Sequence, residues 1–254
     1  MPAICLYFQV HQPYRLRSYR IFDVGQSHDY FDEAQNSAII RRVADKCYLR
    51  ANAVLAEILQ AVPEFRCAFS LTGTALDQLA AHAPETVASF RTLVDSGRVE
   101  LLGETDCHAL SSEASLSEFQ AQVALHRERI EQTFGGTPRV FRNTELVFHN
   151  GVARAVAALG FNAMLGEGAD TLLEWRSPNH VYRAAAAPGL RLLMRNFRLS
   201  DDIAFRFSSR DWIEYPLTAP KLARWLAESP GDVINLFMDY ETFGEHHWPE
   251  TGIL

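Results

Sequence analysis

The chain has 254 residues, of which 48% are hydrophobic, so it is long enough to bury a sizeable core as a single large domain. Its net charge of -7 and its lack of Lys/Arg clusters argue against a nucleic-acid partner, because such binding relies on neutralising phosphates. No apolar stretch approaches the roughly 20 residues that span a bilayer, and no signal peptide precedes the first strand. We therefore expect a cytoplasmic protein without a membrane partner, acting on a neutral polar substrate; its oligomeric state is not predicted.

Strands and helices alternate through the first two thirds of the chain. Apolar runs predict strands at residues 3–10, 65–71, 99–102, 139–142 and 161–165. Helical patterns occupy residues 38–61, 75–81, 86–95, 115–134 and 151–159. Residues 14–36 have no clear period and predict a long loop of the kind that often carries function. This alternation is typical of α/β proteins with a parallel sheet, and a single barrel fits the length.

The pattern weakens between residues 170 and 216. Short runs at 181–185, 190–195 and 204–207 predict an irregular insertion that bears a hairpin. A helix at 219–228 and a strand at 233–238 follow it. No internal repeat, low-complexity segment or linker is visible, so we expect residues 1–254 to form one domain, with the insertion at 170–216 inside it.

Carboxylates follow two of the predicted strands. Glu145 comes three residues after the strand at 139–142, while Asp239 and Glu241 follow the apolar run at 233–237. In a closed parallel barrel the carboxyl ends of the strands share one rim, so these acids should meet there. Two such acids suggest cleavage of a glycosidic bond, which uses one carboxylate as nucleophile and another as acid/base. Alone, each acid would more often be a helix cap or an ion-pair partner, and spacing does not decide between Asp239 and Glu241.

Histidines follow three of the predicted strands, at His11, at His108 and at the pair formed by His246 and His247. Such residues bind metals or donate hydrogen bonds to sugar hydroxyls. The spacings H-x-x-x-H and H-x-D do not occur, so we favour hydroxyl recognition and expect neither a metal nor another cofactor. Trp248 is the candidate for stacking on a sugar ring, because an indole offers a broad apolar face.

Four sequence blocks resemble, in order, the first four sequence regions of glycoside hydrolase family 57, and most closely its α-amylase-like branch. They are YFQVHQPYRL (7–16), ELLGETDCH (100–108), FRNTELVFHN (141–150) and MDYETFGEHHW (238–248). The resemblance implies an incomplete (β/α)7 barrel, which is an α/β fold similar to the TIM barrel. It also implies a retaining double displacement on α-1,4-glucans or maltooligosaccharides, without a catalytic metal.

The resemblance also assigns roles to individual residues. Glu145 corresponds to the nucleophile and Asp239 to the acid/base, which leaves Glu241 a supporting role. His11, and by a looser alignment Glu104 and His108, would contact the sugar before the cleaved bond.

Family members usually continue past the fourth block into a helical segment with a fifth region that covers the cleft. This sequence stops at Leu254, so we expect the catalytic barrel without that C-terminal helical region. The interpretation at this point is an α-amylase-like hydrolase. Three alternatives are open: a 4-α-glucanotransferase with the same residues, a metal-dependent polysaccharide deacetylase-like enzyme on a similar barrel, and a glycan-binding homologue without turnover.

Overall fold

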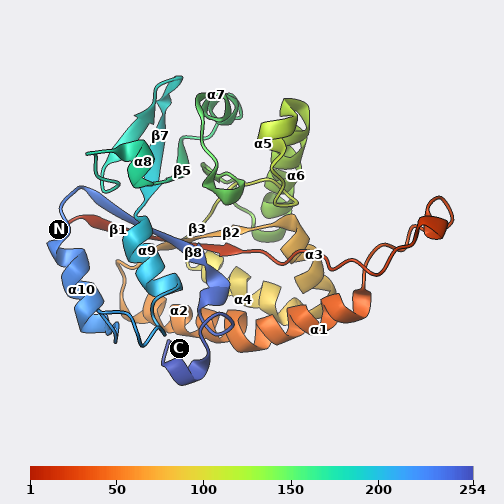
Figure 1. Cartoon of the computed structure of the whole chain (residues 1–254), viewed down its shortest axis with the longest axis horizontal. Helices are drawn as coiled ribbons and strands as arrows, with labels where there is room; N and C mark the ends of the chain where they lie inside the picture. The colour runs from red at the N-terminus through yellow and green to blue at the C-terminus, as the bar shows by residue number, and fades with distance from the viewer. Residues whose placement is uncertain (254) are drawn as a thin grey trace.

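The structure is a computed structural model that describes residues 1–253, except the side chain of Pro249, and it is built around one curved sheet (Figure 1). Within the described residues the strands are β1 (Ala3–Val10), β2 (Cys67–Leu71), β3 (Val99–Leu101), β4 (Val140–Arg142), β5 (Ala163–Glu167), β6 (Val181–Ala184), β7 (Ala187–Arg195) and β8 (Val233–Asp239). Their order along the sheet is β3-β2-β1-β8-β7-β5-β4, with β6 paired to β7 outside this path.

The strands of this path are parallel and form a nearly closed barrel. An isolated bridge between Gly103, after β3, and Phe141 of β4 joins the two ends of the sheet. There the Gly103 amide donates to the Val140 carbonyl at 2.9 Å. A Cβ at Gly103 would lie 2.6 Å from the ring of Phe161, so the bridge requires glycine at this position. The expectation of an incomplete (β/α)7 barrel is confirmed.

Helices surround the barrel, with α1, α2 and α4 on one side of the strands and α5 to α7 on the other (Figure 1). Among the described residues they are α1 (Glu33–Val43), α2 (Leu49–Ala61), α3 (Gly73–His82), α4 (Pro84–Asp95), α5 (Ser111–Ala114), α6 (Leu116–Phe134), α7 (Asn150–Ala158), α8 (Asp170–Leu173), α9 (Phe197–Ala204) and α10 (Ala219–Glu228). The helix expected at 38–61 begins earlier, at Glu33, and a π-helical turn at Ala44–Tyr48 separates α1 from α2. No helix in residues 1–253 has the length and apolarity that crossing a membrane requires.

Residues 170–216 differ from the expected insertion in one important respect. The hairpin is present, because β6 pairs with β7 in antiparallel orientation. However, β7 also pairs in parallel with β5 and β8, so it is a strand of the barrel itself, which corrects the insertion hypothesis for this element. The short run at 204–207 covers the end of a helix, α9, and the turn after it. Asn196 caps α9 by accepting from the Leu199 amide, and the helix continues to Ala204 before the chain turns.

Side chains alternate between the inside and the outside of the barrel, as the pleat of a strand requires. Outward-facing residues pack against the surrounding helices in two large clusters. The inner cluster is small and consists of Tyr7, Ala68, Leu102, Leu146, Leu165 and Phe237, with Cys5, Val140 and Leu193 packed against it. These inner residues fill the barrel beneath the polar side chains at the strand ends.

Candidate active site

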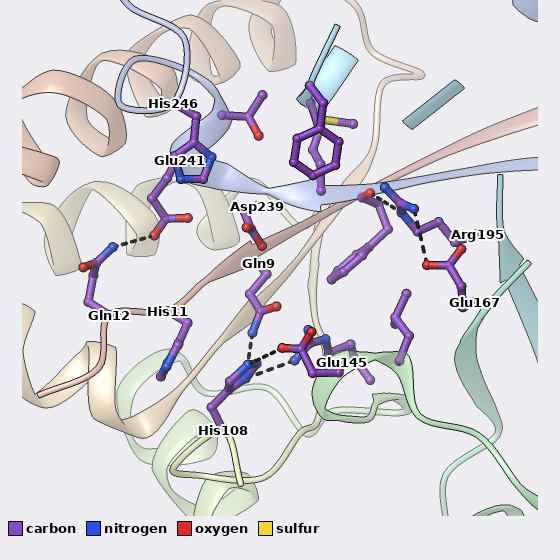
Figure 2. Close-up of a pocket in the computed structure, with 17 residues that line it drawn as sticks. Gln9, His11, Gln12, His108, Glu145, Glu167, Arg195, Asp239, Glu241 and His246 are labelled. Carbon is purple, nitrogen blue, oxygen red and sulfur yellow. Dashed lines mark hydrogen bonds and ion pairs between the residues drawn. The ribbon is translucent and has the colours of Figure 1, made fainter. Parts of the chain in front are cut away.

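A cavity of about 380 Å³ lies at the carboxyl ends of the barrel strands (Figure 2). Enzymes with parallel barrels place their chemistry at this end, because loops from several strands converge there. Its lining includes Gln9, His11, Gln12, His108, Arg142, Glu145, Glu167, Arg195, Phe205, Asp239, Glu241 and His246.

Strand parity explains how five polar side chains enter this cavity. Each lies two residues beyond an inward-facing residue of its own strand, so each also points inward. The five are Gln9, Arg142, Glu167, Arg195 and Asp239. Four of them were not among the candidates from the sequence, and the signal that would have found them is an ionisable or amide side chain in phase with the inner apolar residues at a strand end.

Glu145 lies in the loop after β4 and has a left-handed backbone, with φ 54° and ψ 23°. A residue with a side chain adopts this conformation at a cost of roughly 1–3 kcal/mol, and such strain is concentrated at functional sites. Hydrogen bonds hold the loop in place. The Asn143 side chain donates to the Val147 carbonyl at 3.0 Å, and the Thr144 hydroxyl donates to the Ala109 carbonyl at 2.9 Å. The Glu145 side chain is 69% exposed and faces the cavity.

His108 binds the Glu145 carboxylate through a defined tautomer. Its Nδ1 lies 3.2 Å from Arg142 Nη1 and 3.0 Å from Gln9 Nε2. A guanidinium can only donate, so Nδ1 accepts and the ring proton is on Nε2. That Nε2–H donates to Glu145 Oε1 at 3.1 Å, which orients this oxygen (Figure 2). His108 is itself in the left-handed region, with φ 54°.

Glu104 lies beneath the cavity and is fully buried. The Ser70 hydroxyl donates to its Oε1 at 2.6 Å, and Arg142 Nη1 lies 3.7 Å from its Oε2. Burial alone would raise the pKa of Glu104, but His108, His126, Arg142 and Ser70 outweigh burial and hold the pKa below its usual value. Glu104 is therefore a buried anion that holds Arg142 in place, and the predicted direct contact with a sugar does not fit its position.

His11 stacks on His108, with ring centroids 4.3 Å apart, and its Nδ1 lies 2.9 Å from the Thr72 hydroxyl. Burial lowers the pKa of His11 to about 4, and the nearby His108 acts in the same direction. The ring is therefore neutral at neutral pH. A neutral imidazole both donates and accepts, which suits recognition of a sugar hydroxyl.

Asp239 and Glu241 follow the same strand but occupy different environments. Asp239 ends β8 and is exposed to the cavity, whereas Glu241 is 4% exposed, one short helical turn later. Glu241 Oε1 accepts from Gln12 Nε2 at 3.2 Å and from the hydroxyl of Tyr48, which ends the π-helical turn between α1 and α2. Burial raises the pKa of Glu241 to about 7, and the charge of Asp239 adds to that effect. Of the two, Asp239 has the more accessible carboxylate.

A charged group lies at the opposite end of the cavity. Arg195 Nε donates to the Phe237 carbonyl at 2.8 Å, Nη2 to Asp201 Oδ1 at 2.6 Å and Nη1 to Glu167 Oε2 at 3.3 Å. Burial raises the pKa of Glu167, and Arg195 opposes this effect. These contacts hold Arg195 rigidly and leave Glu167 as the more exposed partner.

The remaining candidates divide between inside and outside the cavity. His246 lines it and is exposed, so it is available to a ligand. His247 is buried elsewhere, against the carbonyls of Ile203 and Ala204. Trp248 is 65% exposed and is not among the residues that line the cavity. Across residues 1–253, no three His, Cys, Asp or Glu side chains come together as ligands for a metal ion.

Comparison with known proteins places the chain in a family. The family model for glycosyl hydrolase family 57 matches residues 5–254. A protein of Methanocaldococcus jannaschii named "Putative alpha-amylase" is 44% identical over an alignment of 252 positions, which covers 97% of this chain and 52% of that protein. The chain thus spans about half the length of this curated relative.

Two of the solved structures that share the fold carry different names. The 4-alpha-glucanotransferase of Thermococcus litoralis superposes with a TM-score of 0.69 at 15% identity, over 99% of this chain and 35% of that enzyme. A "putative polysaccharide deacetylase" of Mycobacterium smegmatis has a TM-score of 0.61 at 16% identity, over 99% of this chain and 81% of that one. At such identities the likeness concerns the fold alone, and the same barrel therefore occurs in proteins with different names.

Proposed function

Because the chain belongs to glycosyl hydrolase family 57, we propose that it cleaves α-1,4-glycosidic bonds of glucans or maltooligosaccharides with retention of configuration. The observation that carries this proposal is the shared cavity of Glu145 and Asp239, which come from the loop after β4 and from the end of β8 (Figure 2). A double displacement requires two carboxylates that face one cavity, one as nucleophile and the other as acid/base.

In the first step Glu145 acts as nucleophile. Its carboxylate oxygen forms a bond to the anomeric carbon while the glycosidic bond breaks, and Asp239 transfers its proton to the departing oxygen. The Nε2–H of His108 supports this role, because its hydrogen bond holds one oxygen of the Glu145 carboxylate and thereby orients the other.

In the second step Asp239, now ionised, accepts a proton from water. The water oxygen bonds to the anomeric carbon, and the ester bond to Glu145 breaks. Arg142 contributes a buried positive charge to both steps. Burial lowers the pKa of Arg142, but Glu104, Glu145 and Asp239 oppose that shift, so the guanidinium stays charged beside the carboxylates.

The single substitution Glu145→Gln tests the proposal. An amide keeps the shape of the side chain but forms no glycosyl-enzyme ester, so cleavage of a maltooligosaccharide ladder should fall by at least about a thousandfold. Glu228→Gln, an exposed carboxylate on α10, is the matched control and should leave the rate unchanged. Product configuration is read by NMR at early times, and the α anomer is expected first.

Two results would contradict the proposal. Full activity of Glu145→Gln would remove the nucleophile assignment, and a β anomer as first product would exclude retention. If the wild-type chain cleaves no member of the ladder but binds it, the alternative of a glycan-binding homologue takes its place.

A further inference from the structure

The two candidate carboxylates divide the barrel rim into two arcs. In the strand order, β1, β2 and β3 lie between Asp239 of β8 and the β4 loop on one side, and β7 and β5 lie between them on the other. The first arc, here the histidine arc, carries His11, Thr72 and His108. The second, here the Glu167 arc, carries Arg195 and Glu167 (Figure 2).

We propose that Glu167 and Phe205 of the Glu167 arc bind the sugar on the far side of the cleaved bond. This sugar leaves in the first step, and a sugar at the same place can act as acceptor in the second. The inference rests on the proposed function, and on the histidine arc holding the sugar that becomes attached to Glu145.

Glu167 is fixed in direction but still open to a ligand. Its Oε1 accepts from the Gly168 amide at 3.1 Å and its Oε2 from Arg195 at 3.3 Å, while 37% of its side chain is exposed. An ionised carboxylate offers about four acceptor positions, so lone pairs are left for hydroxyl donors. A carboxylate held in this way is preorganised to accept from the hydroxyls of a pyranose ring.

The charge of the Glu167 arc indicates which ligands it admits. The guanidinium of Arg195 is already engaged by Glu167, Asp201 and the Phe237 carbonyl, so it has little capacity to bind a further anion. Two carboxylates around one guanidinium give the arc a net negative charge. A neutral sugar therefore fits this arc, whereas a phosphorylated sugar is repelled.

Phe205 supplies the second component of the site. It follows α9, it lines the same cavity as Glu167, and 70% of it is exposed. A sugar ring has an apolar face of C–H groups and an edge of hydroxyls, so an aromatic face and a carboxylate that line one cavity match both. Trp248, the expected stacking residue, is outside the lining of this cavity, and Phe205 is the exposed aromatic residue inside it.

The chemistry of this arc decides between hydrolysis and transfer. When the acceptor hydroxyl of a bound sugar replaces water, its proton moves to Asp239, its oxygen bonds to the anomeric carbon, and the ester bond to Glu145 breaks. Occupancy of the Glu167 arc by a sugar at that moment therefore gives transfer, and its occupancy by water gives hydrolysis.

The test compares two substrates that differ in their leaving group. Maltopentaose must place a leaving sugar in the Glu167 arc, whereas α-maltotriosyl fluoride releases a single atom. In Glu167→Ala the ratio of maltopentaose cleavage to fluoride release should fall at least about tenfold, as expected for a lost hydrogen bond to a charged group. In Phe205→Ala the ratio should fall about three- to tenfold. Transfer to added maltose should decrease in parallel.

Matched controls are Glu228→Ala and Phe22→Ala, an exposed acid and an exposed phenylalanine outside the cavity lining, which should keep the wild-type ratio. Glu167→Gln keeps the side chain's size if the alanine variant fails to fold, and its ratio should fall in the same direction. Wild-type turnover of both substrates with an unchanged ratio in the Glu167 and Phe205 variants overturns this inference alone. Absence of any wild-type turnover overturns the proposed function, and this inference with it.

Discussion

On the histidine arc a buried network of charged side chains supports the polar groups. On the Glu167 arc the polar side chains surround one guanidinium near solvent. Arg142 and Glu104, beneath the first arc, are 3% and 0% exposed. Glu104 holds Arg142 in place, and Arg142 in turn contacts His108. Arg195 and Glu167 are 12% and 37% exposed. A connected, buried network holds its groups in one geometry. Glu167 is also fixed in direction, but it is open to solvent and therefore to ligands that enter and leave. This difference supports the proposal that the histidine arc holds one fixed sugar and that the Glu167 arc exchanges leaving group and acceptor.

The largest expected effect concerns Asp239, at the boundary between the arcs. In Asp239→Asn, cleavage of maltopentaose should fall roughly 10²- to 10⁴-fold, because the leaving oxygen receives no proton. The initial release of fluoride from α-maltotriosyl fluoride should fall far less, since fluoride needs no such assistance. Burst-phase kinetics on both substrates measure the difference.

Glu241→Gln is the companion variant for this prediction. Its carboxylate is buried and bonded to Tyr48 and Gln12, so the leaving group should not determine the size of its effect. If Glu241→Gln shows the leaving-group dependence and Asp239→Asn does not, the acid/base has been assigned to the wrong carboxylate.

Removing Arg142 should break the histidine arc and destabilise the fold. In Arg142→Met the buried Glu104 loses its positive partner, and uncompensated buried charges of this kind cost about 3–5 kcal/mol in the free energy of unfolding. Arg195→Met should cost clearly less, because its carboxylate partners are better solvated. Urea denaturation of both variants provides the comparison, and an equal or reversed order would contradict the burial argument.

Acid should weaken the histidine arc through His11. The pKa of His11 is lowered to about 4 in the folded protein, against an ordinary value of 6.5, so the unfolded chain binds the proton more tightly. The contribution of His11 to stability is therefore complete above pH 6.5 and is lost as the pH falls towards 4. His11→Gln should make the unfolding midpoint less sensitive to pH in this window, as measured by thermal denaturation. An unchanged pH dependence would show that other groups control it.

The smallest expected effect is that of chelation, for which we expect none. EDTA should leave turnover unchanged, because the proposed steps use carboxylates, a histidine and an arginine and no metal. Loss of activity with EDTA, restored by zinc or another divalent ion, would favour the deacetylase-like alternative. It would also contradict the proposal that the two arcs bind the sugars on either side of a cleaved glycosidic bond.

The strands β4 and β7 show which parts of the fold can be predicted from the sequence and which cannot. The run before Asn143-Thr144-Glu145 predicted β4 correctly, and the acid after it lies at the rim as expected. The sequence pattern assigns β7 to an insertion, because its short apolar run gives no information about the strands with which it pairs. Pairing with β5 and β8 depends on residues distant in the chain, which local periodicity does not report.

The resemblance to family 57 implied the barrel. From its residues alone, the sequence predicted the alternation of strands and helices and the strand ends at which the acids and histidines lie. Those features follow from short-range patterns, in which apolar runs end at polar residues. Only the tertiary structure decided that Asp239 faces the cavity while Glu241 is buried, that Arg142 sets the tautomer of His108, and that Phe205 rather than Trp248 lines the cavity. Burial and hydrogen bonding depend on which distant elements close over a residue, and the order of strands around the barrel fixes that choice.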